Sequence, residues 1–398
     1  MITVVSGCAA APVSPSPSPT AGPTSIGTAS PSPTPLPSPG RATPTPSPVP
    51  SCTERVLAGM SVEQRVGQLF LMGLADDRLG QSELAAIRDQ HVGSVWFTAT
   101  TSIGVAGVRR IADAVQAQAS KATTVTVRFF VAANQEGGLI QALTGPGFAT
   151  IPSALAQGGL STKVLEKDAT SWGLALKAAG INLDFAPVFD VVPPGADKTN
   201  KAIGALRREY GHDPGAAGSH AAAFIGGMTR AGVATTAKHF PGLGRVAGNT
   251  DFTAAVVDDT TSAADPYLAS FRMGIMARVP FVMVALATYP RIDPDHLAVF
   301  SYLVIGGLLR RDLGFTGVVM SDDLGATKAV SAIPAGRRAV DFLLAGGDLV
   351  VSKTADATVA MTLAVAARAA TDPGFASRVD DAALRVLEAK HAAGLLPC

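Results

Sequence analysis

The feature that most constrains the fold is an alternation of short apolar runs with longer helix-like segments. Eight runs have the length of a strand, and a segment with helical periodicity follows each of them. The runs are Gln68–Gly73, Val92–Phe97, Val127–Ala133, Ile181–Phe189, Val233–Phe240, Phe281–Leu286, Gly317–Ser321 and Asp348–Ser352. The helix-like segments are Ser82–Gln90, Val105–Ser120, Ser161–Ala179, Ala216–Ala231, Ala264–Ala277, Phe300–Leu313, Ala335–Ala345 and Thr354–Ala369.

This alternation predicts an α/β fold with parallel strands and right-handed crossovers. Eight units in about 320 residues fit a closed (β/α)8 barrel of the TIM type, with a doubly wound open sheet as the alternative. One more helical stretch is expected before the first strand, at Val56–Gly67, with a cap and turn at Ser61–Gln64, and one helix at the end of the chain, at Gly374–Leu396.

Four of the eight expected strands run into polar or charged residues that Gly or Pro follows. These strand ends are Asn134–Gly138, Asp190, Lys238 with His239, and Ser321–Asp323. Branched apolar side chains fill a barrel of this type, so its stability does not require polar strand ends. We therefore expect these residues to meet in a site at the carboxyl edge of the barrel.

The N-terminal region differs in composition from the rest. Fourteen of the 28 prolines lie in residues 1–50, and Arg41 is the only charged residue there. Such a segment cannot bury enough apolar surface to fold, so residues 9–51 are expected to form a disordered tether. The folded domain, which contains the expected barrel, is predicted at residues 52–398.

Residues 1–8 resemble the end of a bacterial lipoprotein signal, in which small residues precede a lipidated cysteine, here Cys8. The basic start and most of the apolar core of such a signal are missing. Either the start codon has been placed too late or the resemblance is accidental. The tether favours a start codon that has been placed too late, because a lipid-anchored protein needs a spacer between the membrane and its folded domain. A lipid anchor at Cys8 implies an extracytoplasmic location at the cell membrane.

Cys52 and Cys398 are the other two cysteines and stand at the two ends of the expected domain. In a compartment that permits disulfides, a bridge between them would reduce the entropy of the unfolded chain by on the order of 4 kcal/mol. Two unrelated thiols are the alternative. A formal net charge of +1 gives no reason to expect a nucleic-acid partner. No apolar run in the sequence is long enough to span a membrane. We expect the protein to be a monomer.

Several motifs occur in an order that resembles glycoside hydrolase family 3, in particular its single-domain β-N-acetylglucosaminidase branch. The resemblance covers about Val62 to Leu387. It rests on Asn134–Gly138, Asn182–Val188, Ile203–Gly204 with Arg208–Gly211, Lys238–Gly242, and Leu308–Asp312 followed by Gly317–Asp322. The resemblance implies a retaining hydrolase that needs a nucleophilic carboxylate and a group that first donates and then accepts a proton.

By this resemblance Asp322 is the nucleophile, because the family signature places it directly after Ser321. The neighbouring Asp323 must point to the other side if the strand continues, so it is expected to support the site from behind. Asp190 is expected to orient the residues that touch the sugar. Substrate-assisted catalysis through the acetamido group is the alternative that an adjacent acidic pair raises.

Lys238, His239 and Arg208 match family positions that bind sugar hydroxyl groups through charge-assisted hydrogen bonds. Asn134 is also assigned to substrate binding, although the family usually has an acidic residue there. A downstream arginine that binds sugar in the branch is replaced by Ala142. Both departures weaken the prediction of sugar specificity.

The acid/base is where this chain departs most from the family. The branch usually has His-Gly shortly after the Lys-His motif and then an Asp-x-His dyad, but here these positions are Leu243, Asn249 and Asp251. Asp251 could itself be the acid/base, with a pKa raised by exclusion of water. Alternatively the site has lost its proton shuttle and binds sugars or cleaves only activated substrates.

The sequence therefore predicts an exo-acting β-N-acetylhexosaminidase that removes terminal GlcNAc from peptidoglycan-derived fragments. The alternatives are a catalytically weak sugar-binding lipoprotein and a family 3 enzyme with another β-glycoside specificity. No Cys/His cluster has metal-ligand spacing and no Gly-rich phosphate loop follows a strand, so the sequence predicts neither metal nor cofactor.

Overall fold

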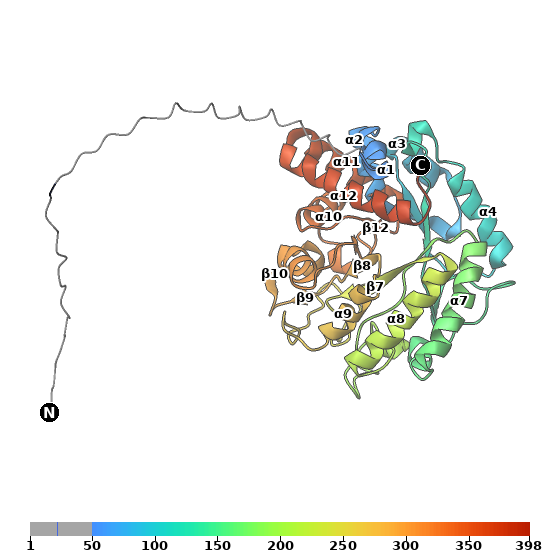
Figure 1. Ribbon diagram of the computed structural model, residues 1–398, viewed down its shortest axis with the longest axis vertical. Helices are drawn as coiled ribbons and strands as arrows, with labels where there is room; N and C mark the ends of the chain where they lie inside the picture. Colours follow the sequence, from blue (N-terminus) through green and yellow to red (C-terminus); the bar gives the residue numbers. More distant parts are fainter. Residues whose placement is uncertain (1–21, 23–49) are drawn as a thin grey trace. The chain divides into compact units, whose positions relative to one another are not determined.

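The computed structural model describes residue 22 and residues 50–398, and residues 50–398 form one compact unit. Cys8, residues 1–8 and most of the predicted tether lie outside the described residues. Eight parallel strands occupy the centre of the compact unit and helices surround them (Figure 1). The strands are β1 (Phe70–Leu74), β2 (Ser94–Phe97), β3 (Phe130–Ala133), β6 (Leu183–Asp184), β7 (Ala234–Phe240), β8 (Phe281–Val284), β11 (Val318–Ser321) and β12 (Val350–Ser352).

The strands pair in the order β11-β8-β7-β6-β3-β2-β1-β12. Barrel strands that lie side by side are therefore also consecutive barrel strands along the chain. A parallel bridge between Met320 and Leu349 joins the two ends of this sheet. The Ser321 amide also donates to the Leu349 carbonyl at 3.0 Å. The sheet therefore closes into the predicted barrel, and the open doubly wound alternative is wrong.

The eight predicted helices are present, with bounds that shift by a few residues. They are α3 (Gln81–Gln90), α4 (Gly104–Gln116), α7 (Thr162–Ala178), α8 (Pro214–Ala231), α9 (Leu268–Met276), η4 (Leu303–Asp312), α10 (Ala335–Leu344) and α11 (Ala355–Thr371). The helix η4 has the wider π-type turn instead of the α-type. Short extra elements are α5 (Lys121–Thr124), α6 (Ala154–Gln157), η1 (Ala75–Asp77), η2 (Gly204–Leu206), η3 (Ala298–Phe300), η5 (Lys328–Val330), and the hairpins β4 (Gln135–Gly137) with β5 (Ile140–Gln141) and β9 (Thr288–Tyr289) with β10 (Asp293–Leu297).

The helical stretch predicted at Val56–Gly67, with a cap and turn at Ser61–Gln64, corresponds to two helices: α1 (Cys52–Ala58) and α2 (Val62–Gln68). Ser61 begins the second helix. Its hydroxyl accepts from the Gln64 amide and the Gln64 side chain accepts from the Ser61 amide. This reciprocal capping box confirms the predicted cap at Ser61 and starts a new helix there.

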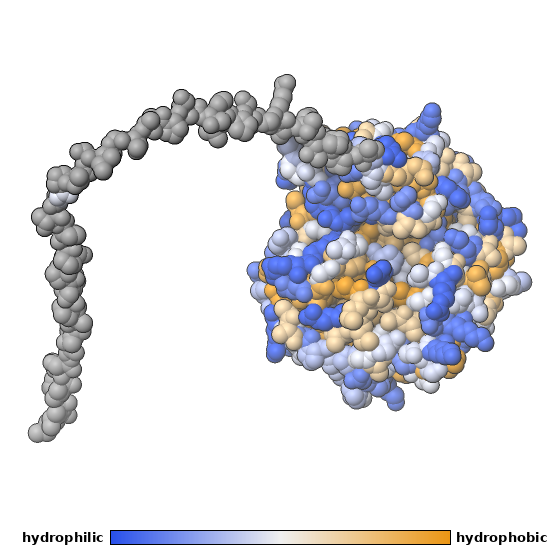
Figure 2. Space-filling model, viewed as in Figure 1, coloured by the Kyte–Doolittle hydropathy of each residue, from blue (hydrophilic) through white to orange (hydrophobic). Residues whose placement is uncertain are grey.

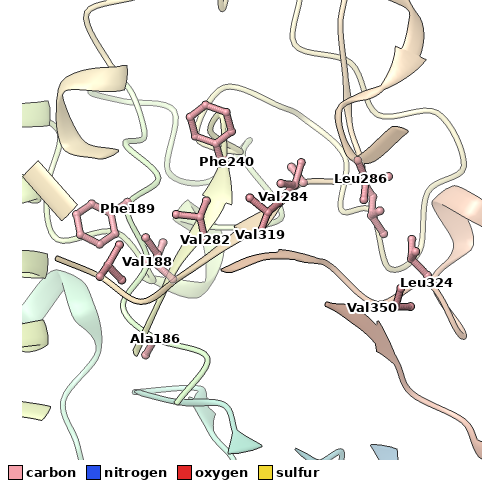
Figure 3. Packing of buried hydrophobic residues seen from close by; sticks show 14 of the residues in the cluster. Ala186, Val188, Phe189, Phe240, Val282, Val284, Leu286, Val319, Leu324 and Val350 are labelled. Atoms are coloured by element: carbon pink, nitrogen blue, oxygen red, sulfur yellow. The ribbon is translucent and has the colours of Figure 1, made fainter. Parts of the chain in front are cut away.

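Two apolar layers follow from the period-two alternation of the strands. Phe281 and Met283 of β8 belong to a cluster to which most of the barrel strands contribute, and this cluster fills the interior. Val282 and Val284 of the same strand instead join the larger cluster between strands and helices (Figure 3). The barrel interior is thus a packed and mainly apolar core.

The last helix, α12 (Pro373–Ala392), closes the amino end of the barrel. Lys390 on this helix is fully buried, and its Nζ donates to Gln68 Oε1 and to the Gly93 carbonyl, each at 2.7 Å. No carboxylate pairs with it within residues 50–398, and burial lowers its pKa to about 7. A disulfide joins Cys398 to Cys52, so the two ends of the compact unit are covalently connected.

The face in Figure 2 intersperses hydrophilic and hydrophobic residues over the compact unit. Among the most exposed large apolar side chains is Phe252, which is 81 % exposed. None of the helices in the described part of the chain combines the length and the apolar composition needed to cross a bilayer.

Candidate active site

A cavity of about 370 Å³ opens at the carboxyl ends of the barrel strands. This volume lies within the range of pockets that bind small molecules. Residues that follow six different strands line it, and Trp96, Phe185 and Met283 are among its apolar side chains. Nearly all residues assigned to the site from the sequence line this cavity: Asn134, Arg208, Lys238, His239, Asn249, Asp251, Asp322 and Asp323.

A buried carboxylate, Glu136, organises the cationic side of the cavity. Its Oε1 lies 2.6 Å from Lys238 Nζ, and both of its oxygens accept from Arg208, at 2.7 and 2.8 Å. Lys238 Nζ also donates to Asn134 Oδ1 at 2.7 Å. Burial alone would raise the pKa of Glu136, but the charges of Arg208 and Lys238 outweigh it and lower this pKa to about 2.

Sequence reasoning gave Glu136 no role of its own, although the residue lies within the Asn134–Gly138 motif. The signal that could have found it is its place in the hairpin that directly follows β3, at the carboxyl edge of the barrel. A carboxylate there must either face the substrate or neutralise the two cations. The structure shows the second arrangement, because Glu136 is only 3 % exposed.

His239 is fixed by Asp190, which follows β6 and does not line the cavity itself. His239 Nδ1 lies 2.7 Å from Asp190 Oδ2, and the Leu243 amide donates to Asp190 Oδ1 at 2.7 Å. The register between β7 and β8 shifts after Lys238, and such a bulge re-aims side chains. Both Lys238 and His239 consequently face the cavity, with Nε2 of the histidine free of Asp190.

The adjacent carboxylates Asp322 and Asp323 have different surroundings. Asp322 lines the cavity, and its Oδ1 accepts only from the Asp323 amide, at 2.8 Å, within the described residues. Asp323 accepts from the amides of Gly325 and Lys353, at 2.7 and 2.8 Å. Asp323 therefore connects the loop after β11 to the end of β12, and Asp322 is the member of the pair that is available to a ligand.

Asp251 lies in the long loop after β7 and reaches the same cavity from the side. Its backbone carbonyl accepts from the Lys328 amide at 3.2 Å, which attaches this loop to the segment after Asp322. Asn249 Oδ1 accepts from the Asp251 amide at 2.9 Å, so Asn249 shapes the turn and not the carboxylate. Loss of hydration, and then the negative charge of Asp322, raise the pKa of Asp251.

The barrel and this cavity can now be compared with known proteins. The model for the glycosyl hydrolase family 3 N-terminal domain matches residues 61–389. The chain belongs to glycosyl hydrolase family 3. It is 31 % identical over 293 residues to a β-hexosaminidase from Stenotrophomonas maltophilia (strain K279a), covering 71 % of this chain and 82 % of that protein.

Solved structures of family 3 proteins also resemble this chain. A β-N-acetylhexosaminidase from Beutenbergia cavernae DSM 12333 is 47 % identical, with a TM-score of 0.82, and the match covers 83 % of this chain and 99 % of that one. A family 3 β-N-acetylglucosaminidase from Paenibacillus sp. str. FPU-7 is 28 % identical, with a TM-score of 0.76, and the match covers 84 % and 63 %. The predicted family and its single-domain β-N-acetylhexosaminidase branch are confirmed, and the chain is a glycoside hydrolase.

Within the described residues, one group of side chains has the composition of a metal site: Asp197, Glu209 and His212. It belongs to the loop between β6 and α8 and is not part of the cavity lining. The sequence predicted no metal and no cofactor, because these ligands come from two separated parts of one loop and match no spacing motif.

Proposed function

We propose that the protein is a retaining exo-β-N-acetylglucosaminidase in which Asp322 is the nucleophile and Asp251 is the acid/base. The observation that carries this proposal is that the two carboxylates line one cavity and influence each other electrostatically. Retaining hydrolysis needs two carboxyl groups with opposite protonation states on either side of the glycosidic bond. The raised pKa of Asp251 supports its role as the protonated member of the pair.

In the first step, an Asp322 oxygen forms a bond to the anomeric carbon while the bond to the leaving oxygen breaks. The Asp251 proton passes to that leaving oxygen, and its carboxylate remains. In the second step, Asp251 removes a proton from water, the water oxygen bonds to the anomeric carbon, and Asp322 is released. The cycle restores both groups without any other reactant.

The cationic side of the cavity is suited to hold the sugar. A lysine has three N–H donors and an arginine has five. Glu136 and Asn134 occupy two donors of Lys238, and Glu136 with the Ala202 carbonyl occupy three of Arg208. One donor of Lys238 and two of Arg208 remain for hydroxyl groups of the sugar.

The β-N-acetylhexosaminidase names of the similar proteins favour a terminal GlcNAc as the sugar, and we extend this to peptidoglycan-derived fragments. We further propose an extracytoplasmic, monomeric enzyme that is anchored to the membrane by lipid at Cys8. The disulfide between Cys52 and Cys398 supports an oxidising compartment, because such bonds are rare in the cytosol. Metabolic labelling with a radioactive fatty acid, in wild type and Cys8→Ser, tests the anchor.

The activity test compares wild type with Asp322→Asn and Asp251→Asn on a chromogenic N-acetylglucosaminide and on unactivated chitobiose. Asp322→Asn should lose both activities by at least about 10³-fold. Asp251→Asn should lose chitobiose hydrolysis far more than chromogenic hydrolysis, because a good leaving group needs no proton. Asp259→Asn, an exposed carboxylate of the same loop, is the matched control.

Two results would contradict the proposal. Full hydrolysis of chitobiose by Asp251→Asn would show that another group is the acid/base. Wild type could also be inactive on several aryl glycosides and still bind GlcNAc. This result would support the alternative of a catalytically weak sugar-binding protein that has lost its proton shuttle.

A further inference from the structure

Three potential ligands for a cation lie together in the loop between β6 and α8. One ligand atom each from Asp197, Glu209 and His212 is within 4.8 Å of the others. This group does not line the cavity, and the proposed hydrolysis uses none of its members. An acidic cluster alone is weak evidence, because exposed carboxylates often lie close together without any ion.

The decisive observation is the state of Glu209. Its side chain is fully buried, and neither carboxylate oxygen has a hydrogen-bond partner in the part of the chain that the structure describes. The Asp197 carboxyl and the Glu209 amide lie close to it, but two ionised carboxylates both accept hydrogen bonds, so Asp197 can partner Glu209 only when one of the two carries a proton. An uncompensated buried carboxylate is destabilising, and a cation beside Glu209 would compensate it.

His212 has the orientation of a metal ligand. Its Nδ1 lies 2.9 Å from the Val192 carbonyl oxygen, so Nδ1 carries the proton and donates it. The lone pair is then on Nε2, which faces Asp197 Oδ1 at 3.6 Å without a hydrogen bond. Histidines that bind metals usually make this kind of hydrogen bond through the other ring nitrogen.

The spacing of the group also fits a cation. Two ligands that are each about 2.1 Å from a tetrahedrally coordinated ion lie about 3.4 Å apart, close to the 3.6 Å between His212 and Asp197. These two side chains are about a third exposed, so an ion can enter from solvent. Glu209 forms the buried side of the site.

We infer that Asp197, Glu209 and His212 bind a divalent transition-metal cation. An imidazole with two carboxylates is a mixed nitrogen and oxygen donor set, which suits Zn²⁺ or Mn²⁺ better than Mg²⁺ or Ca²⁺. The inference departs from the sequence-based expectation of no metal, and it does not rest on the proposed reaction.

The position of the site gives the cation a structural role. Glu209 directly follows Arg208, whose guanidinium contacts Glu136 in the cavity. The same loop is fixed by Asn200, whose side chain donates to the Leu243 and Val246 carbonyls of the loop after β7. Gly204 packs closely on the Asp197 backbone, where a Cβ would approach within 2.7 Å. A cation at this point would fix both parts of the loop that supplies Arg208.

The test is a titration of the full chain with Zn²⁺ alone, after treatment with EDTA and desalting, by isothermal calorimetry. Wild type should bind one equivalent more than Glu209→Gln and His212→Ala, and Zn²⁺ should raise the wild-type Tm by about 2–5 °C. His391→Ala, which removes an exposed histidine elsewhere, should behave as wild type. Comparing stoichiometries separates this site from any Zn²⁺ held by His239.

Equal stoichiometry in all four proteins would overturn the inference. A Glu209→Gln variant that is more stable than wild type and binds the same amount of Zn²⁺ would also overturn the inference. That result would show that Asp197 and Glu209 share a proton and bind no metal. Should a variant fail to fold, anomalous scattering from a Zn²⁺-soaked wild-type crystal decides the question. A peak among the three side chains supports the site, and an empty position refutes it.

Discussion

Replacing Glu136 by glutamine should destabilise the protein strongly, although the substitution only exchanges one carboxylate oxygen for an amide NH2 group. Glu136 is the only carboxylate in the described residues that forms an ion pair with Arg208 or Lys238. Both cations are nearly buried, with side-chain exposures of 14 % and 2 %. The variant keeps the shape of the side chain and removes the charge that compensates them.

The magnitude can be worked out from the pKa. A decrease from 4.5 to about 2 corresponds to roughly 3 kcal/mol of stabilisation at neutral pH. Because the folded pKa is the lower one, this stabilisation is complete above about pH 4.5 and is lost as the pH falls toward 2. Removing one partner of a buried ion pair costs about 3–5 kcal/mol in general. Lys238 can limit the loss by releasing its proton, because burial lowers its pKa.

We therefore expect Glu136→Gln to lower the free energy of unfolding by about 3 kcal/mol at pH 7, measured by urea denaturation with an unchanged m-value. The matched control is Glu166→Gln. Glu166 pairs with Arg230 at the same 2.7 Å, but that arginine side chain is 63 % exposed. The control should lose less than about 1 kcal/mol. Equal small losses in both variants would refute the reasoning, because burial would then not determine the strength of the pair.

Three further predictions concern titration and the ends of the chain. The alkaline limb of the kcat/KM profile should disappear in Asp251→Asn, because wild type loses activity as the pH rises through the raised pKa of Asp251. The pKa of Lys390 is about 7 in the folded state and about 10.4 in the unfolded chain. The free energy of unfolding of wild type should therefore increase by up to about 4 kcal/mol between pH 7 and 10, because only the unfolded chain still binds the proton there. Denaturation of Lys390→Met over the same pH range should show no such increase. The double variant Cys52→Ser/Cys398→Ser should lose about 4 kcal/mol of unfolding free energy, with an equal loss in wild type under a reductant.

The barrel could be predicted from the sequence because each strand is short, apolar and followed by a helix with clear periodicity. The order of strands then follows from right-handed crossovers alone. The cap at Ser61 was also predicted, but the predicted stretch began at Val56 and left out the start of α1 at Cys52. The hairpin of β4 and β5 was also not foreseen, because its residues are polar and its register depends on a bulge.

The candidate site was predictable where a residue lies at the end of a strand or directly after it, as Lys238 and Asp322 do. Partners that meet through loops were harder to foresee. Nothing in the spacing of Glu136, Arg208 and Lys238 indicates that they form one ion network, since three different strands supply them. The same limit applies to Asp197 and Glu209, whose ligand atoms approach each other only after the loop between β6 and α8 has folded.

These contacts divide the cavity into a fixed half and a titratable half. In the fixed half, the pKa of Glu136 is near 2, so Glu136 keeps its charge across the physiological range and holds Arg208 and Lys238 in place. In the other half, Asp251 and Asp322 line the same cavity, and within the described residues neither forms an ion pair with a lysine, arginine or histidine. For the proposed acid/base role of Asp251, the required rise in pKa comes from loss of hydration and from the charge of Asp322, whereas the charges of Arg208 and His239 oppose it.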